Sequence, residues 1–174
     1  MSKSDNDIVF KTKRLFVRPY SMDDFDNFFR LNGDEEVMRY IRPAQTREQS
    51  KEFLQKIITA YTERPGIGRW GMFLREDKKF IGSFAIIPVE QSDKLQLGYA
   101  LLKENWGKGY ASESVKKGIQ YAFGKLQLKE IAAITFPENV SSQKVLLKNG
   151  FSFDTTFAEG DKLLNLYMLH KPKE

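Results

Sequence analysis

Two glycines near the middle of the chain are the residues best suited to bind an anion. Gly107 and Gly109 lie in the stretch 106–113, which reads WGKGYASE. Glycine adopts backbone angles that are closed to other residues and lets a ligand approach the main chain. A helix that begins behind such a turn adds unpaired N–H groups and a partial positive charge. The pattern predicts a phosphate site, and a tight strand-to-helix turn without a ligand is the simpler alternative.

Two better-known phosphate loops do not fit this stretch. No Gly-Lys-Ser or Gly-Lys-Thr follows at the spacing of a nucleoside-triphosphate loop. The third glycine of the dinucleotide-binding fingerprint is missing, and the turn follows a strand meander instead of a first βαβ unit.

A second polar element follows the next buried-type strand. Asn139 comes after the apolar run 130–136, and a helical segment then extends to Lys148 before Asn149 and Gly150. Ligands commonly bind at the carboxyl ends of strands in open sheets. The Asn139 side chain could bond an extended amide ligand, or it could simply cap the helix.

The amino-acid composition limits which catalytic sites and partners the chain can have. The 174 residues suit one domain, and they include no cysteine and one histidine, His170. Thiolate chemistry is thereby excluded, and a His-based triad or metal cluster has little support, so we expect no metal. The net charge is +5, but Lys and Arg are scattered, so we do not expect nucleic acid as a partner. No apolar run could serve as a signal peptide or membrane span, which predicts a cytoplasmic protein.

Hydrophobic periodicity predicts the elements that must position these residues. The expected strands cover residues 8–10, 15–18, 69–74, 80–89, 95–102, 130–136, 151–157 and 163–169. The expected helices begin after Ser21, at 35–40, after Thr46, at 111–123 and after Asn139 or Ser141. We therefore predict a single α+β domain over residues 1–174, with a mixed, mostly antiparallel central sheet flanked by helices.

The motifs together resemble the GNAT superfamily of acyl-CoA-dependent N-acetyltransferases. Within it, the chain is most similar to the Rim-type branch, which includes the ribosomal-protein-alanine acetyltransferases. The resemblance spans about residues 12–169. The matching motifs stand in family order: 12–19 (TKRLFVRP), Gly82, 97–99 (LGY), 106–113, Asn139 with Ser142, and 148–151 (KNGF).

The resemblance implies acetyl-CoA as the acetyl donor, bound where two central strands, 95–102 and 130–136, splay apart. It implies main-chain pairing of the pantetheine arm with Leu101 and Leu102, and a bond to pantetheine from Asn139. It also implies contact of Lys144 with the adenosine phosphate. The residues implied to hold the pyrophosphate are Gly107, Lys108, Gly109, Tyr110, Ala111 and Ser112.

For catalysis, the resemblance implies direct transfer of the acetyl group to an amine. Many family members have a tyrosine acid in the helix after the Asn, where this chain has Leu146 and Leu147. We instead expect Ser142 to protonate the leaving thiolate, against the alternative that it is a plain first-turn helix residue. No base stands out, because Glu104 and Glu138 are better explained as solvated side chains.

The sequence leaves the acceptor open. A protein N-terminus and a small-molecule amine both fit, and a homodimer is compatible with the pattern. Two other functions are alternatives: a GNAT-like module that binds CoA or an acylated metabolite without turnover, and a basic nucleic-acid-binding protein, which only the net charge supports.

Overall fold

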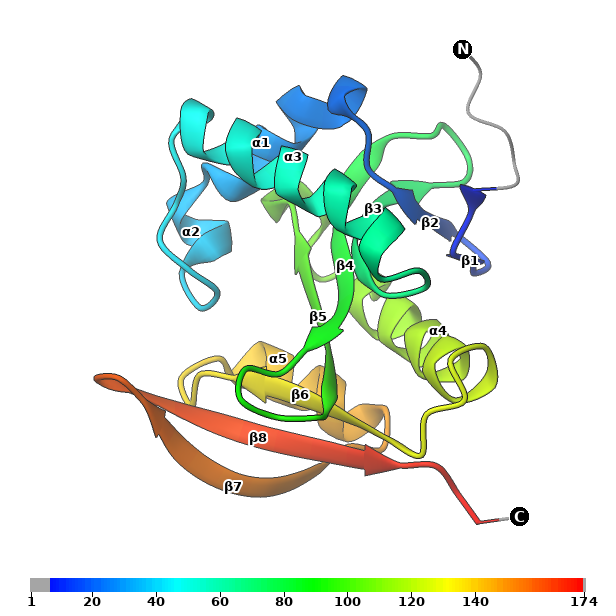
Figure 1. The fold of residues 1–174 in the computed structure, drawn as a ribbon, viewed down its shortest axis with the longest axis vertical. Helices are drawn as coiled ribbons and strands as arrows, with labels where there is room; N and C mark the ends of the chain where they lie inside the picture. Colours follow the sequence, from blue (N-terminus) through cyan, green and yellow to red (C-terminus); the bar gives the residue numbers. More distant parts are fainter. Residues whose placement is uncertain (1–6, 174) are drawn as a thin grey trace.

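A computed structural model describes residues 7–173. Eight strands form one sheet in the order β1-β2-β3-β4-β5-β6-β8-β7 (Figure 1). Neighbouring strands are antiparallel except for β5 and β6, which run parallel. The strands are β1 Phe10–Lys11, β2 Leu15–Pro19, β3 Gly68–Leu74, β4 Phe80–Pro88, β5 Leu95–Leu101, β6 Glu130–Thr135, β7 Ser152–Glu159 and β8 Lys162–His170. The predicted α+β fold with a mostly antiparallel sheet is confirmed.

Helices cover the sheet at both ends. The helices α1, α2 and α3 gather beside β2–β4, while α5 lies against β6 (Figure 1). They are α1 Phe25–Asn32, α2 Glu35–Met38, α3 Arg47–Glu63, α4 Tyr110–Gly124 and α5 Val140–Lys148, with 3-10 turns at Met22–Asp24 and Lys103–Asn105. Within residues 7–173, no helix is both long and apolar enough to cross a membrane.

Polar caps set where two of these helices begin. The Thr46 hydroxyl accepts a hydrogen bond from the Gln49 N–H at 3.2 Å, and the Gln49 side chain accepts one from the Thr46 N–H at 2.9 Å. This reciprocal pair satisfies two N–H groups that the helix leaves unpaired. Asn139 caps α5 through its side-chain oxygen, which accepts from the Ser142 N–H at 3.2 Å.

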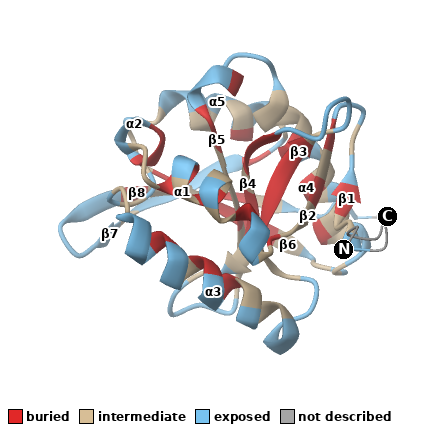
Figure 2. Ribbon diagram, turned by 90° about the horizontal axis from the view of Figure 1, so that it is seen from above, coloured by how far each residue is buried: buried red, intermediate tan, exposed pale blue. Residues whose placement is uncertain are grey.

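Two hydrophobic clusters hold the layers together. The larger one lies under β2–β6 and α4, and its side chains include Phe84, Ile86 and Val115, all 0% exposed. The smaller one packs α1–α3 against the sheet around Phe28 and Leu54. Figure 2 shows buried residues running along β3 and β4. Side chains of these two strands belong to both clusters, so the middle of the sheet packs against hydrophobic side chains on each face.

The sheet opens where β5 and β6 run parallel. Between β5 and β6 a single register pair, Gln96 with Ala132, joins the strands, whereas β4 and β5 are paired over seven positions. Figure 1 shows the two strands diverging beyond this point. The predicted splay of the central strands is confirmed. It leaves main-chain groups of β5 facing a gap instead of a neighbouring strand.

Candidate active site

A cavity of about 450 Å³ occupies the gap between the splayed strands. Residues 96–100 of β5 line one wall and residues 133–136 line the other. The segment from α1 to α3 covers it, with Tyr40 and Phe136 in ring contact at 6.2 Å between centroids. The volume falls in the range that is usual for small-molecule sites.

The glycine turn has the backbone that its sequence predicts. Gly107 and Gly109 have φ angles of +70° and +81°, in the left-handed region. Gly109 is the N-cap residue of α4, so the helix begins directly behind the turn. Residues 107–109 are exposed, and Tyr110, Ala111 and Ser112 are half-buried. The turn therefore presents helix N–H groups to an anion at the surface.

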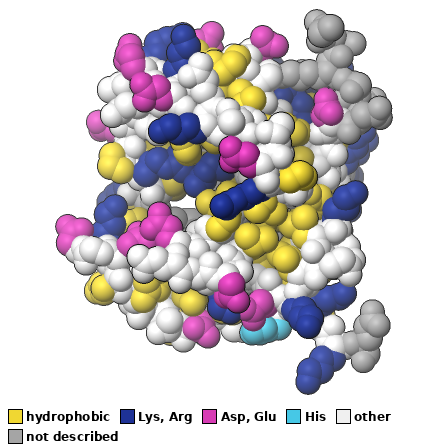
Figure 3. Space-filling view, viewed as in Figure 1, with side chains coloured by type: hydrophobic (Ala, Val, Ile, Leu, Met, Phe, Trp, Pro, Cys, Tyr) yellow, Lys and Arg dark blue, Asp and Glu magenta, His cyan; other side chains and the backbone are white. Residues whose placement is uncertain are grey.

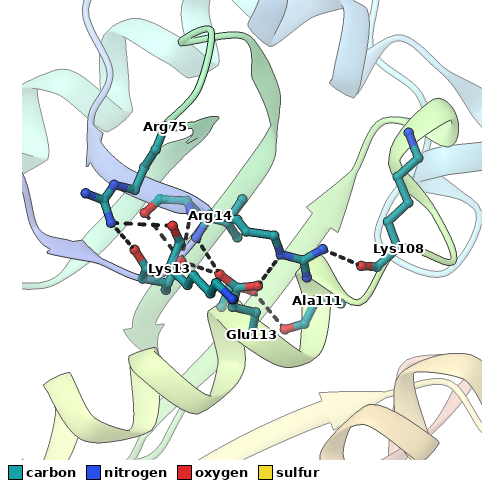
Figure 4. A network of polar contacts seen from close by, with 9 residues as sticks. Lys13, Arg14, Arg75, Lys108, Ala111 and Glu113 are labelled. Atoms are coloured by element: carbon teal, nitrogen blue, oxygen red, sulfur yellow. Dashed lines mark hydrogen bonds and ion pairs between the residues drawn. The ribbon is translucent and has the colours of Figure 1, made fainter.

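A network from the first hairpin braces this turn (Figure 4). Arg14 Nε donates to Glu113 Oε2 at 2.7 Å, and Arg14 Nη1 donates to the Lys108 carbonyl at 3.0 Å. Thr12 Oγ1 donates to Glu113 Oε1 at 2.6 Å. Burial works to raise the pKa of the Glu113 carboxyl, but its bonds to Thr12 and Arg14 outweigh this and lower that pKa. Arg14 thus ties the loop and the first turn of α4 to β2.

Leu101 and Leu102, both predicted to pair with the pantetheine arm, differ in their main-chain hydrogen bonds. The Leu102 N–H donates to the Ile81 carbonyl at 2.9 Å, and its carbonyl accepts from the Asn105 N–H at 2.9 Å. Because antiparallel bonds alternate along a strand, the Leu101 N–H points away from β4, toward the gap. The Leu101 carbonyl accepts from Trp106 Nε1 at 2.8 Å. The Leu101 N–H therefore lies on the side away from β4, while both main-chain groups of Leu102 are engaged within the protein.

Of the predicted residues on the second element, Asn139 and Ser142 line the cavity and Lys144 is exposed. The Asn139 oxygen is used as the helix cap, which leaves its amide nitrogen as the group that can donate to a ligand. At the far end of α5, Asn149 Nδ2 donates to Ser112 Oγ at 3.1 Å. This bond links α5 to the first turn of α4.

The structure adds one residue that sequence reasoning missed. The Tyr99 hydroxyl lies 3.4 Å from Ser142 Oγ, and both residues line the cavity. Burial raises the pKa of Tyr99, and its bond to Ser142 only partly opposes this, so the phenol stays protonated at neutral pH. The only signal in the sequence was the match of 97–99 to the family pattern, which assigns no role to the side chain.

The carboxylates near the motifs in sequence lie outside the cavity. Glu104 is exposed and pairs with Arg30, and Glu138 is exposed. The carboxylates that do line the cavity are Glu90 and Glu159, both exposed. The cavity combines two neighbouring hydroxyls with both apolar and polar lining residues and has, among the residues that the structure describes, no buried carboxylate pair, which suits acyl transfer better than hydrolysis by a buried acid pair.

Comparison with known proteins decides the family. Residues 14–152 match the sequence family described as an acetyltransferase (GNAT) domain. The chain belongs to the GNAT acetyltransferase family. It is similar to YoaA, an uncharacterised N-acetyltransferase of Bacillus subtilis, at 31% identity over 95% of this chain and 98% of the relative. It is 33% identical to the uncharacterised N-acetyltransferase p20 of Bacillus licheniformis, over 90% of this chain and 92% of p20.

Solved GNAT structures share the fold. A GNAT-family acetyltransferase from Bacillus anthracis has a TM-score of 0.81 at 23% identity, covering 92% of this chain and 96% of its own. RimL, a ribosomal L7/L12 α-N-protein acetyltransferase solved with coenzyme A, has a TM-score of 0.80 at 14% identity, covering 94% and 97%. The protein is accordingly an acetyl-CoA-dependent N-acetyltransferase.

Proposed function

We propose that the protein transfers the acetyl group of acetyl-CoA directly to a primary amine held in the cavity, and that residues 1–174 act as one N-acetyltransferase domain. The observation that carries the proposal is the single-pair junction of β5 and β6. Its gap holds Asn139 and Ser142 in one cavity. The helix α5, which Asn139 caps, is bonded to the first turn of α4 through Asn149 and Ser112.

The residues present fit acetyl-CoA. The turn 107–112 offers main-chain N–H groups and a helix N-terminus to the pyrophosphate. The Leu101 N–H faces the gap, where an extended pantetheine arm would lie. The Asn139 amide nitrogen is available to the same arm, and the exposed Lys144 is available to the adenosine phosphate.

The proposed reaction balances without a covalent enzyme intermediate. A neutral amine attacks the thioester carbonyl carbon, a C–N bond forms, and the C–S bond breaks. A main-chain N–H near Leu101 stabilises the negative charge that develops on the carbonyl oxygen. Ser142, in contact with the Tyr99 hydroxyl, donates a proton to the departing thiolate and regains one from solvent, directly or through Tyr99. The attacking nitrogen, positively charged once the C–N bond has formed, loses a proton to solvent, so the products are the amide and free CoA thiol.

The acceptor is a primary amine, either a small molecule or a protein N-terminus. RimL is described as acting on ribosomal L7/L12, but the likeness to RimL is one of fold at 14% identity and brings no acceptor to this chain.

A thiol-release assay tests the proposal. The protein is incubated with acetyl-CoA and a panel of amines, free CoA is followed, and products are identified by mass spectrometry. We expect amine-dependent thiol release and an acetylated product that is heavier by one acetyl group. In parallel, acetyl-CoA should raise the melting temperature, because a ligand that binds only the folded state stabilises it. Binding without release for every amine would favour the non-catalytic module, and neither binding nor release would reject the proposal.

A further inference from the structure

Two arginines face the cavity without an acidic partner. Arg42, between α2 and α3, and Arg69, in β3, are half-buried and line the cavity. Within residues 7–173, neither forms an ion pair. Four other arginines each pair with a carboxylate: Arg14 with Glu113, Arg18 with Asp24, Arg30 with Glu104 and Arg47 with Asp26. Arg39, Arg64 and Arg75 also form no ion pair within the described residues, but they are exposed. The cavity pair therefore differs in being half-buried without a carboxylate partner.

Neighbouring side chains hold the pair in position. Arg42 Nη1 donates to Asn32 Oδ1 at 2.9 Å, and the buried Asn32 donates to the Phe28 carbonyl at 2.9 Å. The guanidinium carbons of Arg42 and Arg69 lie 4.9 and 5.7 Å from the centroid of the Phe53 ring. Cation–π contacts of this kind fix a guanidinium and shield one of its faces from water. The two cations are thus preorganised beside the same ring.

Their proximity has an electrostatic cost. Burial lowers the pKa of Arg69 to about 10, and the positive charge of Arg42 adds to the effect. Two partly desolvated like charges are unfavourable unless an anion lies between them. The other charged residues that line the cavity are Glu90, Glu159 and Lys162, which are exposed and make no ion pair with either arginine. Figure 3 shows Lys and Arg side chains gathered along a hollow between the helical half and the lower sheet.

We propose that the amine acceptor carries an oxyanion, a carboxylate or a phosphate, which Arg42 and Arg69 bind, so that the substrate is a small amino acid or a similar anionic amine. This inference rests on the proposed function and specifies its acceptor. Guanidinium groups bind carboxylates and phosphates through paired N–H donors, and such charge-assisted bonds are the strong ones. The acceptor must be small, because the cavity of about 450 Å³ also has to admit the acetyl end of the donor.

Matched pairs of acceptors test the charge requirement. Leucine is compared with leucinamide and phenylalanine with phenylalaninamide, while phosphoethanolamine is compared with ethanolamine. The second member of each pair, called the neutral member below, has its primary amino group at the same position but lacks the oxyanion. The first is called the anionic member. We expect kcat/KM to be roughly tenfold to a hundredfold higher for the anionic member. The amino groups of the two amides are less basic than those of the amino acids, so a larger fraction of each amide is in the reactive deprotonated form. Amine basicity therefore favours the amides, and a higher kcat/KM for the amino acids would have to come from their carboxylate. The amino acid pairs report on a carboxylate, and the phosphoethanolamine pair reports on a phosphate.

Variants of the arginines test the assignment. Arg42→Gln and Arg69→Gln should each raise KM for the preferred anionic amine about tenfold or more and leave the neutral member within about twofold. Arg69→Lys should retain part of the preference because it keeps the charge. Arg64→Gln removes an exposed arginine outside the cavity and should leave KM unchanged for both the anionic and the neutral acceptor. Unfolding curves and acetyl-CoA titration establish that each variant is folded and still binds the donor.

The outcomes separate this inference from the proposed function. If neutral amines are acetylated as well as anionic ones, or if Arg42→Gln and Arg69→Gln slow both members of a pair equally, the oxyanion site is rejected while acetyl transfer stands. If no amine supports thiol release, calorimetric titration of the CoA-bound protein with leucine and leucinamide still tests whether the oxyanion site exists. Heat from leucine alone, lost in Arg69→Gln, supports the site, and equal or absent heat rejects it.

Discussion

The Tyr99 and Ser142 hydroxyls lie 3.4 Å apart, although Tyr99 is in β5 and Ser142 is in the first turn of α5. The two elements belong to the two sides of the splayed junction, so their contact forms only when the sheet opens as it does. The contact gives Ser142 a neighbour that can resupply a proton.

Ser142→Ala and Tyr99→Phe test this pair. If Ser142 protonates the thiolate, its loss should lower kcat by roughly tenfold or more, because a positioned acid contributes only in the transition state. Tyr99→Phe should lower kcat less, since Ser142 remains and can take its proton from water. Affinity for acetyl-CoA, measured by titration calorimetry, should stay unchanged in both variants.

The double variant provides the control for this prediction. If the hydroxyls act as one unit, the combined variant should be no slower than Ser142→Ala alone, because coupled residues are not additive. A turnover number in Ser142→Ala equal to that of the wild type would instead leave water as the proton donor.

Gly109→Val should abolish acetyl-CoA binding and leave the fold largely intact. The φ angle of +81° at Gly109 costs a residue with a side chain about 1–2 kcal/mol, and valine is branched as well. A Cβ at this position would also lie 3.4 Å from the Arg14 guanidinium that braces the turn. The measurement is calorimetric titration with acetyl-CoA beside a thermal unfolding curve.

Gly124→Ala is the matched control for that variant. Gly124 ends α4 without a left-handed φ, and a Cβ there would meet no atom within 4 Å. The control should bind acetyl-CoA normally and be stabilised by a few tenths of a kcal/mol to about 1 kcal/mol. Wild-type affinity in Gly109→Val would exclude the turn as the pyrophosphate site.

Glu113→Gln should destabilise the protein at neutral pH, and the loss should fade in acid. The pKa of Glu113 is lowered in the folded state from its ordinary value of 4.5, so the carboxylate stabilises the fold above about pH 4.5. This contribution is lost as the pH falls through the lowered pKa. We expect about 1–2 kcal/mol at pH 7, because Arg14 is partly exposed and its ion pair is screened.

Chemical unfolding of wild type and Glu113→Gln at pH 7 and pH 4 measures this difference. The gap in unfolding free energy should be smaller at pH 4. A gap that stays constant with pH would mean that the Glu113 charge contributes nothing and that only the shape of the side chain matters. Weaker acetyl-CoA binding in the same variant would indicate that the brace also positions the turn.

Local signals in the sequence predicted much of the fold. The helices expected after Thr46 and after Asn139 begin where the pattern predicted, and the second of them ends before Asn149 and Gly150 as expected. The helix predicted over 111–123 ends at Gly124 in the structure. Its left-handed residue is Gln127, three positions on, after the chain has made two further bonds back to α4, and no signal in the sequence predicts that conformation.

The candidate site was predictable where its residues are close in sequence. The glycine turn and the Asn139 element each form one short motif. Arg42 and Arg69 carry no such signal, because one lies in a loop and the other in a strand, and only the packing of both against Phe53 brings them together. Long-range pairings of this kind leave no periodic or spacing pattern for sequence reasoning to use.

Asn139 tests whether capping and ligand binding can be separated in one side chain. Its oxygen accepts the Ser142 N–H at 3.2 Å, and its nitrogen is left for the pantetheine arm. Asn139→Asp keeps the capping oxygen but removes the donor, so it should weaken acetyl-CoA binding about five- to tenfold while stability is retained. Asn139→Ala should weaken binding similarly and also lower the unfolding free energy by about 1 kcal/mol. Calorimetric titration and chemical unfolding of both variants give the two readouts. Normal acetyl-CoA affinity in Asn139→Asp would show that the residue serves only as the helix cap.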